Sequence, residues 1–164
     1  AAVQATIAAF AKEGVRAEPM KVSHAFHSPL MRPMLAAFER AAGGVTRAAP
    51  EVRIISSMTG RVADAEWGSA KYWIEQLQSP VRYADAIRTA VESGIAAALE
   101  IGPHPVLAAL GHRSLPDADI AWFSSLRRGR DDWTTWLGTL GDLYVRGVVD
   151  DWSGVERRAV RARA

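Results

Sequence analysis

Short apolar runs of strand length alternate along this chain with longer segments whose apolar residues recur every three or four positions. Residues 15–23, 51–58, 96–101 and 121–124 predict strands. Strands that alternate with helices pack as layers around a mainly parallel sheet, so the pattern predicts an α/β fold. The predicted helices, which begin or end at glycine, proline or serine, cover residues 3–10, 29–42, 72–77, 83–93, 106–111 and 133–144.

The composition is that of a globular chain without cysteine. Its 164 residues leave room for one compact domain or for pieces of two, and 49% of them are hydrophobic. We find no signal-peptide pattern at the start and no apolar run near the ~20 residues that a membrane helix needs. The lack of cysteine excludes disulfides, a thiol nucleophile and thiolate metal ligands, and it fits a cytoplasmic protein.

The basic character of the chain belongs to its C-terminal tail, residues 157–164. Four arginines lie there, and without them the net charge falls from +2 to −2. Such tails are usually solvated. Because no basic stripe is interleaved with aromatic residues, we do not predict nucleic-acid binding.

His27 stands between a predicted strand and a predicted helix. Ser28 and Pro29, which follow it, are typical N-cap and N1 residues. Such junctions present functional side chains in α/β folds, and the helix dipole there disfavours an imidazolium. A neutral imidazole can act as a general base. For an isolated histidine, however, the commoner interpretation is that it merely caps a turn.

The sequence around His27 favours the general base over the turn cap. Residues 24–31 read His-Ala-Phe-His-Ser-Pro-Leu-Met. They resemble the signature of malonyl-selective acyltransferase domains of modular polyketide synthases, whose catalytic base is the second histidine of an H-A-F-H tetrad. Methylmalonyl-selective relatives carry Y-A-S-H at the same place. The resemblance implies that His27 is the base and that His24 and Phe26 contact the substrate, Phe26 being the residue that sets selectivity.

Further segments resemble the same family in the same order. Residues 55–60 resemble its strand and turn, residues 72–84 its Y-W-x-x-[NQ]-L…P-V-[RK]-[FY] segment, and residues 99–107 its L-E-[IVL]-G-P-x-x-x-L loop. Residues 125–128 and 143–152 resemble the segment that follows the domain. The assignment depends on the order and spacing of these matches together.

The resemblance implies an organisation of the chain. Residues 1–23 are expected to be the last helix and strand of a ferredoxin-like small subdomain. Residues 24–125 are expected to be the C-terminal part of an α/β-hydrolase-like large subdomain, and residues 126–164 a post-acyltransferase linker with a flexible tail. Because no serine has a glycine two positions before it, the G-H-S-x-G nucleophile is not in this chain. The arginine that binds the malonyl carboxylate is also expected upstream, so the chain alone is expected to be inactive.

The resemblance also implies ping-pong acyl transfer. Malonyl moves from CoA to a serine and then to the phosphopantetheine thiol of an acyl carrier protein, with His27 as the base. A backbone carbonyl, expected from the loop that holds Glu100 and Gly102, orients the histidine. The implied partners are the N-terminal part of the same domain, the carrier protein, and the ketosynthase with its linker. We expect no bound cofactor, metal, nucleic acid or membrane.

Two other interpretations stay open. The chain could be a non-catalytic fragment or scaffold that contributes only packing and carrier-protein contacts. An unrelated Ser/His hydrolase would need an elbow serine that the sequence lacks. We interpret His104 as structural, His112 as a charge near a helix C-terminus, and Trp133 and Trp136 as core residues.

Overall fold

The chain forms two compact units in the computed structural model, which describes residues 2–17, 19 and 22–155. The first unit comprises Ala1–Ala49 and Ala65–Val81, and the second comprises Pro50–Asp64 and Arg82–Ala164. Each unit therefore draws on two separate stretches of the sequence.

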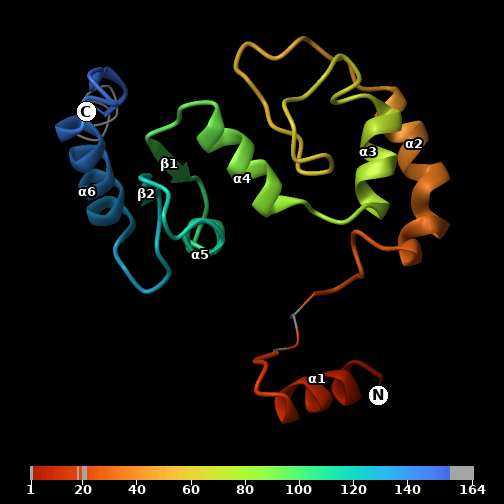
Figure 1. Ribbon diagram of the computed structural model, residues 1–164. Helices are drawn as coiled ribbons and strands as arrows, with labels where there is room; N and C mark the ends of the chain where they lie inside the picture. The colour runs from red at the N-terminus through yellow and green to blue at the C-terminus, as the bar shows by residue number, and fades with distance from the viewer. Residues whose placement is uncertain (1, 18, 20–21, 156–164) are drawn as a thin grey trace. The chain divides into compact units, whose positions relative to one another are not determined.

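Both units are labelled by element in Figure 1. The first contains the helix α1 (Ala2–Lys12), the 3₁₀ helix η1 (Pro29–Met34), α2 (Leu35–Gly43) and α3 (Ala70–Gln78). The second contains α4 (Tyr83–Glu92), β1 (Ala97–Glu100), α5 (Leu107–Ser114), β2 (Ala121–Ser124) and α6 (Asp132–Val145). None of the helices in the described part of the chain is long and apolar enough to cross a membrane.

The strands β1 and β2 pair in parallel, as the alternating pattern predicted. Their register runs from Ala97 opposite Ala121 to Glu100 opposite Ser124. A parallel pair needs a crossover connection, and α5 lies within it. The predictions of strands at 96–101 and 121–124 and of an α/β fold are therefore confirmed.

The strand predicted at residues 51–58 is wrong. Only Ile55 pairs, in a single antiparallel bridge with Val62. The backbone instead closes a turn, because the N–H of Gly60 donates to the carbonyl of Ser56 at 2.8 Å and Gly60 adopts a φ of 71°. A strand needs a partner over several residues, and an apolar run cannot show from its own sequence whether one is available.

The strand predicted at residues 15–23 is not seen either. Residues 15–17, 19, 22 and 23 form no strand, and the others lie outside the described residues. The flexible tail predicted at 157–164 also lies outside them.

The start of η1 follows the predicted capping rule. The side chain of Ser28 accepts a hydrogen bond from the N–H of Leu30, with Pro29 as the next residue, as predicted. The helix opens as a 3₁₀ turn and becomes a regular α-helix at Leu35. Pro33 explains the delay, because it lies inside η1 and has no N–H to donate.

The core of the second unit lies where α6 packs against β2. Leu140 and Leu143 are buried there, and the hydroxyl of Thr139 donates to the carbonyl of Ser124 at 2.8 Å. Trp136 is half-buried, but Trp133 is 47% exposed. The interpretation of Trp133 as a core residue is therefore wrong, because it lies in the first turn of α6, away from the residues that contact the sheet.

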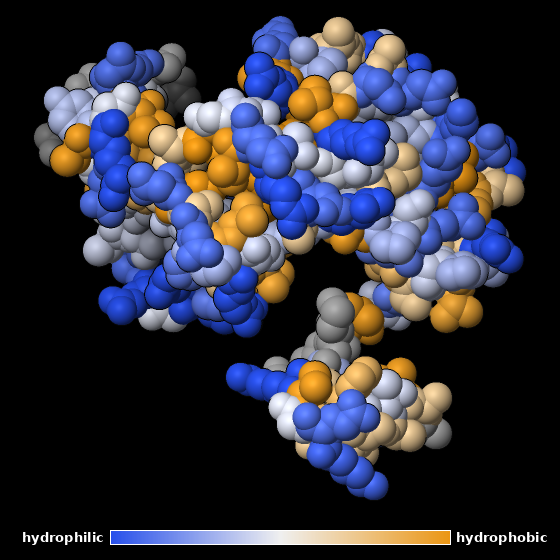
Figure 2. Space-filling view, viewed as in Figure 1, coloured by the Kyte–Doolittle hydropathy of each residue, from blue (hydrophilic) through white to orange (hydrophobic). Residues whose placement is uncertain are grey.

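Several apolar side chains stay exposed in both units. In α1 no residue is buried, and Val3 is 65% exposed. In α6, Val145 is 85% exposed. Figure 2 shows apolar residues on the visible surface of the chain. Water-exposed faces of this kind are typical of surfaces that contact further protein.

Gly111 allows α5 to approach β2 closely. A Cβ added at this buried position would overlap the ring of Trp122, with ring carbon Cζ3 only 2.6 Å away. We expect Gly111→Ala to lower the free energy of unfolding by about 1–3 kcal/mol through overpacking. Gly138→Ala in α6 is the control, since nothing lies within 4 Å of its Cβ. The control should stabilise by up to about 1 kcal/mol through helix propensity. Urea unfolding followed by circular dichroism measures both, and equal effects would contradict the packing argument.

Candidate functional site

His27 has an unusual backbone conformation. Its φ is 61°, and no other non-glycine residue in the described ranges has a positive φ. Its N–H donates to the carbonyl of Leu77 at 2.9 Å, which holds the chain in this conformation. Left-handed residues other than glycine are uncommon, and they are concentrated at functional sites.

The ring of His27 is fixed by a second hydrogen bond at the same place. Its Nδ1 lies 3.0 Å from the carbonyl oxygen of Gln76. A carbonyl can only accept, so Nδ1 carries the hydrogen. In the neutral ring, Nε2 then has the free lone pair, and it has no hydrogen-bond partner among the described residues. The arrangement therefore presents a nitrogen that can accept a proton.

Both carbonyls that contact His27 belong to the last turn of α3. Carbonyls there lack intrahelical partners. In a longer helix the N–H of residue 80 would bind the Gln76 carbonyl, but residue 80 is proline and has no N–H. The helix stops at Ser79, whose own N–H donates to the carbonyl of Glu75. The Gln76 carbonyl is thus left for an imidazole 49 residues earlier in the sequence.

The position of α3 is fixed at its other end. The side chain of Ser69 accepts from the N–H of Tyr72 at 2.9 Å and caps the helix. Tyr72 is buried, and its ring meets the ring of Trp73 edge-on, with centroids 5.1 Å apart. Trp67 also contacts both rings. The segment that starts with the Tyr-Trp pair therefore anchors the helix whose end holds His27.

Within the first unit, the acceptor beside Nδ1 of His27 is the Gln76 carbonyl, whereas the sequence expectation named the loop of Glu100 and Gly102, which belongs to the second unit. The carbonyl of Glu100 accepts from the N–H of Ser125, and that of Gly102 accepts from the Ser125 hydroxyl. The sequence held a signal for the Gln76 carbonyl as an acceptor, because a helix stopped by Ser-Pro leaves free acceptors at its end.

The Glu100 side chain has a structural role instead. Its carboxylate accepts from the N–H groups of Ala108, at 2.8 Å, and Val106, at 3.2 Å, at the start of α5. Burial raises the pKa of Glu100, but backbone N–H donors at Ala108, Leu107 and Val106 lower it, and the net pKa lies below the ordinary value. The loop at 101–106 is thus closed by a helix-capping carboxylate.

His24 and Phe26 lie on the same turn as His27. Their rings meet edge-on with centroids 6.0 Å apart, and Nδ1 of His24 lies 3.1 Å from Oγ of Ser23. Phe26 is 50% exposed. Phe26 therefore does not belong to the core of the first unit, and its ring is available to contact another molecule or segment.

The remaining histidines lie apart from this turn in the sequence. His112 lies in the last turn of α5, as predicted, and His104 is exposed in the loop before it. In the part of the chain that the structure describes, no group of three or more His, Asp or Glu side chains is arranged to hold a metal ion.

Comparison with known proteins gives consistent matches. A family model for the acyl transferase domain matches residues 1–149. Phenolphthiocerol synthesis polyketide synthase type I Pks15/1 of Mycobacterium bovis is 38% identical over 155 residues, which cover 94% of this chain. The acyltransferase domain from the second module of the salinomycin polyketide synthase is 38% identical over 93% of this chain, with a TM-score of 0.84. A malonyl-CoA:acyl carrier protein transacylase of Xanthomonas oryzae is 27% identical over 86% of this chain, with a TM-score of 0.71.

The matched proteins are all longer than this chain. The match covers 7% of the Mycobacterium bovis protein, 36% of the salinomycin acyltransferase chain and 43% of the Xanthomonas oryzae chain. The chain thus corresponds to less than half of each solved structure and to a small share of the synthase.

The capping role of Glu100 makes stability depend on pH. Its pKa is lower in the folded chain than in the unfolded chain, where Glu titrates at about 4.3. The stabilisation is therefore complete above that pH and is lost as the pH falls through the folded-state pKa. We expect Glu100→Gln to cost about 0.5–2 kcal/mol at pH 7, and the difference from wild type to shrink below about pH 4. Urea unfolding at several pH values checks this, with exposed Glu51→Gln as the control; a difference independent of pH would contradict it.

Proposed function

This chain belongs to the acyl transferase domain family, and we propose that His27 is the general base of a malonyl transferase. The single observation that supports this most is the hydrogen bond from Nδ1 to the Gln76 carbonyl, which leaves Nε2 as the basic nitrogen. A histidine base needs an orienting acceptor of this kind, and a backbone carbonyl can take the place that a carboxylate has in other hydrolases and transferases.

The proposed reaction has two halves. In the first, Nε2 accepts the proton of a serine hydroxyl, the serine oxygen bonds to the malonyl carbonyl carbon, and the thioester C–S bond breaks. The departing CoA sulfur takes the proton from the imidazolium. In the second, Nε2 accepts the proton of a phosphopantetheine thiol, a new C–S bond forms, and the serine oxygen leaves and recovers the proton. The Gln76 carbonyl stabilises the imidazolium in both halves.

We place the nucleophilic serine and the arginine for the malonyl carboxylate on the rest of the same domain. The chain corresponds to 36% of the solved salinomycin acyltransferase chain, so most of that structure has no counterpart here. The exposed apolar side chains of α1 and α6, including Val3 and Val145, supply surface for such a neighbour. Nε2 of His27 has no other partner among the described residues, which leaves it available to a serine from that part.

The domain is proposed to act within a cytoplasmic polyketide synthase, with a carrier protein as acceptor and a ketosynthase as neighbour. The Mycobacterium bovis relative is by name a polyketide synthase, and this chain matches only 7% of its length. A domain embedded in a longer synthase would fit that proportion. The subdomain boundaries at residues 23 and 125 stay predictions.

Phe26 is proposed as the residue that selects malonyl over methylmalonyl. Phe26 directly precedes the proposed base in the sequence. Its ring is half-exposed and meets the ring of His24 edge-on. A phenyl ring beside the α-carbon of the substrate would occupy the volume that an α-methyl group needs. Exclusion by a filled pocket is a repulsive form of selection.

Replacing His27 tests the assignment of the base. We expect His27→Asn in the complete domain to lower acylation by roughly a hundredfold or more. Asparagine is the preferred variant because it tolerates a left-handed backbone better than alanine does. His24→Ala is the matched control and should cost much less. The measurement is covalent labelling with radioactive malonyl-CoA, alongside circular dichroism; near-wild-type labelling of a folded His27→Asn variant would show that another group is the base.

Replacing Phe26 tests the selectivity. If the ring is a gate, Phe26→Ser should leave the domain folded and raise kcat/KM for methylmalonyl-CoA relative to malonyl-CoA by about 10- to 200-fold, the usual effect of one methyl group. We expect a relaxed rather than inverted preference, because His24 is unchanged. If the ring only packs, the variant should lower the free energy of unfolding and slow both substrates equally.

The control for this substitution is Leu30→Ser. Leu30 is 75% exposed in η1, so the change removes an exposed apolar side chain a few residues away. It should leave the ratio of the two kcat/KM values unchanged. An unchanged ratio in a folded Phe26→Ser variant would refute the gate.

A further inference from the structure

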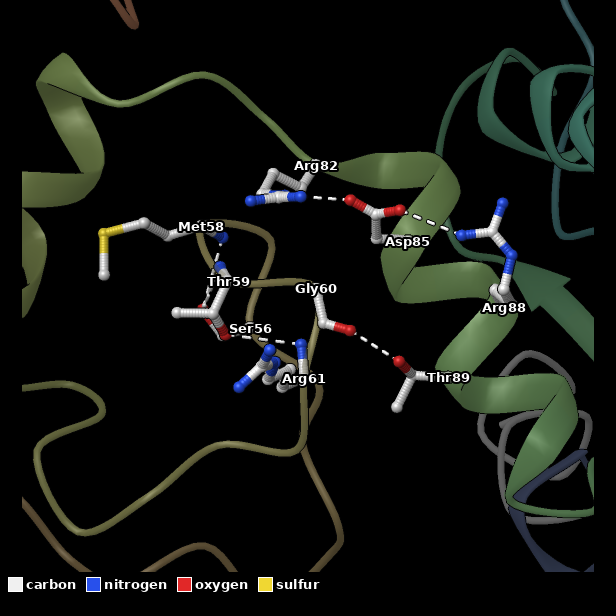
Figure 3. A network of polar contacts seen from close by, with 9 residues as sticks. All are labelled: Ser56, Met58, Thr59, Gly60, Arg61, Arg82, Asp85, Arg88 and Thr89. Carbon is white, nitrogen blue, oxygen red and sulfur yellow. Dashed lines mark hydrogen bonds and ion pairs between the residues drawn. The ribbon is translucent and has the colours of Figure 1, made fainter.

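A hollow of about 630 Å³ lies within the second unit, between the turn at residues 56–61 and α4. Three arginines line it, Arg61 from the turn and Arg82 and Arg88 from the start and middle of α4 (Figure 3). We call this site the arginine pocket. The proposed acyl transfer assigns no role to it.

Hydrogen bonds connect the turn at residues 56–61 to α4 and its N-cap beneath the arginine pocket. The hydroxyl of Thr89 donates to the carbonyl of Gly60 at 2.5 Å, and the N–H of Arg82 donates to the carbonyl of Ser57 at 2.7 Å. Gly60 has a φ of 71°, and a Cβ there would lie 2.5 Å from Cβ of Asp85. The turn and the helix are therefore in direct contact, so the arginines stand on a preformed support.

One carboxylate positions two of the guanidinium groups. Asp85 accepts from Nε of Arg82 at 2.8 Å and from Nη1 of Arg88 at 2.9 Å, using a different oxygen for each (Figure 3). Hydrogen bonds from Arg82 and Arg88 keep the pKa of Asp85 low, so this carboxylate stays ionised at neutral pH. Both side chains remain more than half exposed, which leaves their other N–H groups available.

Arg61 adds a charge without a partner of its own. Its guanidinium makes no ion pair or hydrogen bond with any residue in the described ranges. Around the pocket, Asp64 and Asp85 balance two of the three arginines, which leaves one net positive charge. Planar guanidinium groups with free N–H donors match phosphate and carboxylate oxygens.

We propose that the arginine pocket binds the phosphate that ends the pantetheine arm. This group is common to CoA and to a phosphopantetheinylated carrier protein, the donor and acceptor of the proposed reaction, on which this inference rests. A pantetheine arm has no charge of its own, so the phosphate is the group with which an arginine cluster can form charge-assisted hydrogen bonds. Arg61 provides a guanidinium without an ion-pair partner among the described residues, while Asp85 holds Arg82 and Arg88 in place.

Direct binding tests the proposal without any need for activity. CoA, 4′-phosphopantetheine and pantetheine are titrated into the ¹⁵N-labelled chain, and the amide signals of Gly60 and Thr89 are followed. We expect shifts with the two phosphate-bearing probes and none with pantetheine. Arg61→Ala should weaken the binding of CoA by about tenfold or more, as expected for the loss of charge-assisted hydrogen bonds. Arg61→Lys should retain part of it, because the charge remains.

Arg113→Ala is the matched control. Arg113 is an exposed arginine of the same unit, in α5 and outside the pocket. It should not change the affinity for CoA. The proposal is overturned if Arg113→Ala weakens binding as much as Arg61→Ala, if pantetheine binds as well as CoA, or if none of the probes shifts Gly60 and Thr89. It is also overturned if a carrier protein without phosphopantetheine shifts them as strongly as one that carries it, because the partner would then be a protein surface.

Kinetics of the complete domain distinguish the two sources of phosphate. Arg61→Ala should raise KM for malonyl-CoA, for the phosphopantetheinylated carrier protein, or for both, and leave transfer from malonyl-pantetheine unchanged. An equal effect on malonyl-pantetheine would overturn the phosphate subsite. If neither donor acylates the wild-type domain, the proposed function fails, while the binding titrations still decide whether the pocket recognises phosphate.

Discussion

Two carbonyls at the C-terminal end of α3 determine the geometry of the candidate site. The carbonyl of Leu77 holds the backbone of His27 in a left-handed conformation, and the carbonyl of Gln76 fixes its ring and its tautomer. Neither interaction depends on a carboxylate, so the histidine is oriented by the backbone alone. The site therefore requires that α3 end at residue 78, and the aromatic residues at its other end matter because they fix where that end lies.

The second unit is organised around a different polar group, the buried Ser125. Its hydroxyl accepts from the N–H of Gly102 and donates to the carbonyl of the same residue, while its N–H donates to the carbonyl of Glu100. The Glu100 side chain then caps α5. A motif that resembles part of an active-site signature thus connects the parallel strands to the crossover helix. Its hydrogen bonds within the second unit close the loop between β1 and α5.

Elements governed by local rules could be predicted from the sequence, and elements governed by distant partners could not. The cap at Ser28, the helices and the strands at 97–100 and 121–124 follow from spacing and from capping residues. The predicted strand at 51–58 became a turn, because its neighbour is not encoded in its own residues. For the candidate site, the resemblance named His27 and expected its acceptor in the loop of Glu100 and Gly102, whereas the acceptor in the structure is the Gln76 carbonyl. Gln76 lies 49 residues away, and the contact depends on where a helix stops, which the resemblance did not specify.

The orientation of the His27 ring depends on Pro80, although the hydrogen bond that fixes the ring is made by Gln76. Any other residue there would bring an N–H that competes with the imidazole for the Gln76 carbonyl, since that N–H is the one a longer α3 would use. Helix elongation and histidine orientation thus draw on the same oxygen atom. A residue with an N–H at position 80 could extend α3 by one hydrogen bond, and the imidazole of His27 would then have to share the Gln76 carbonyl.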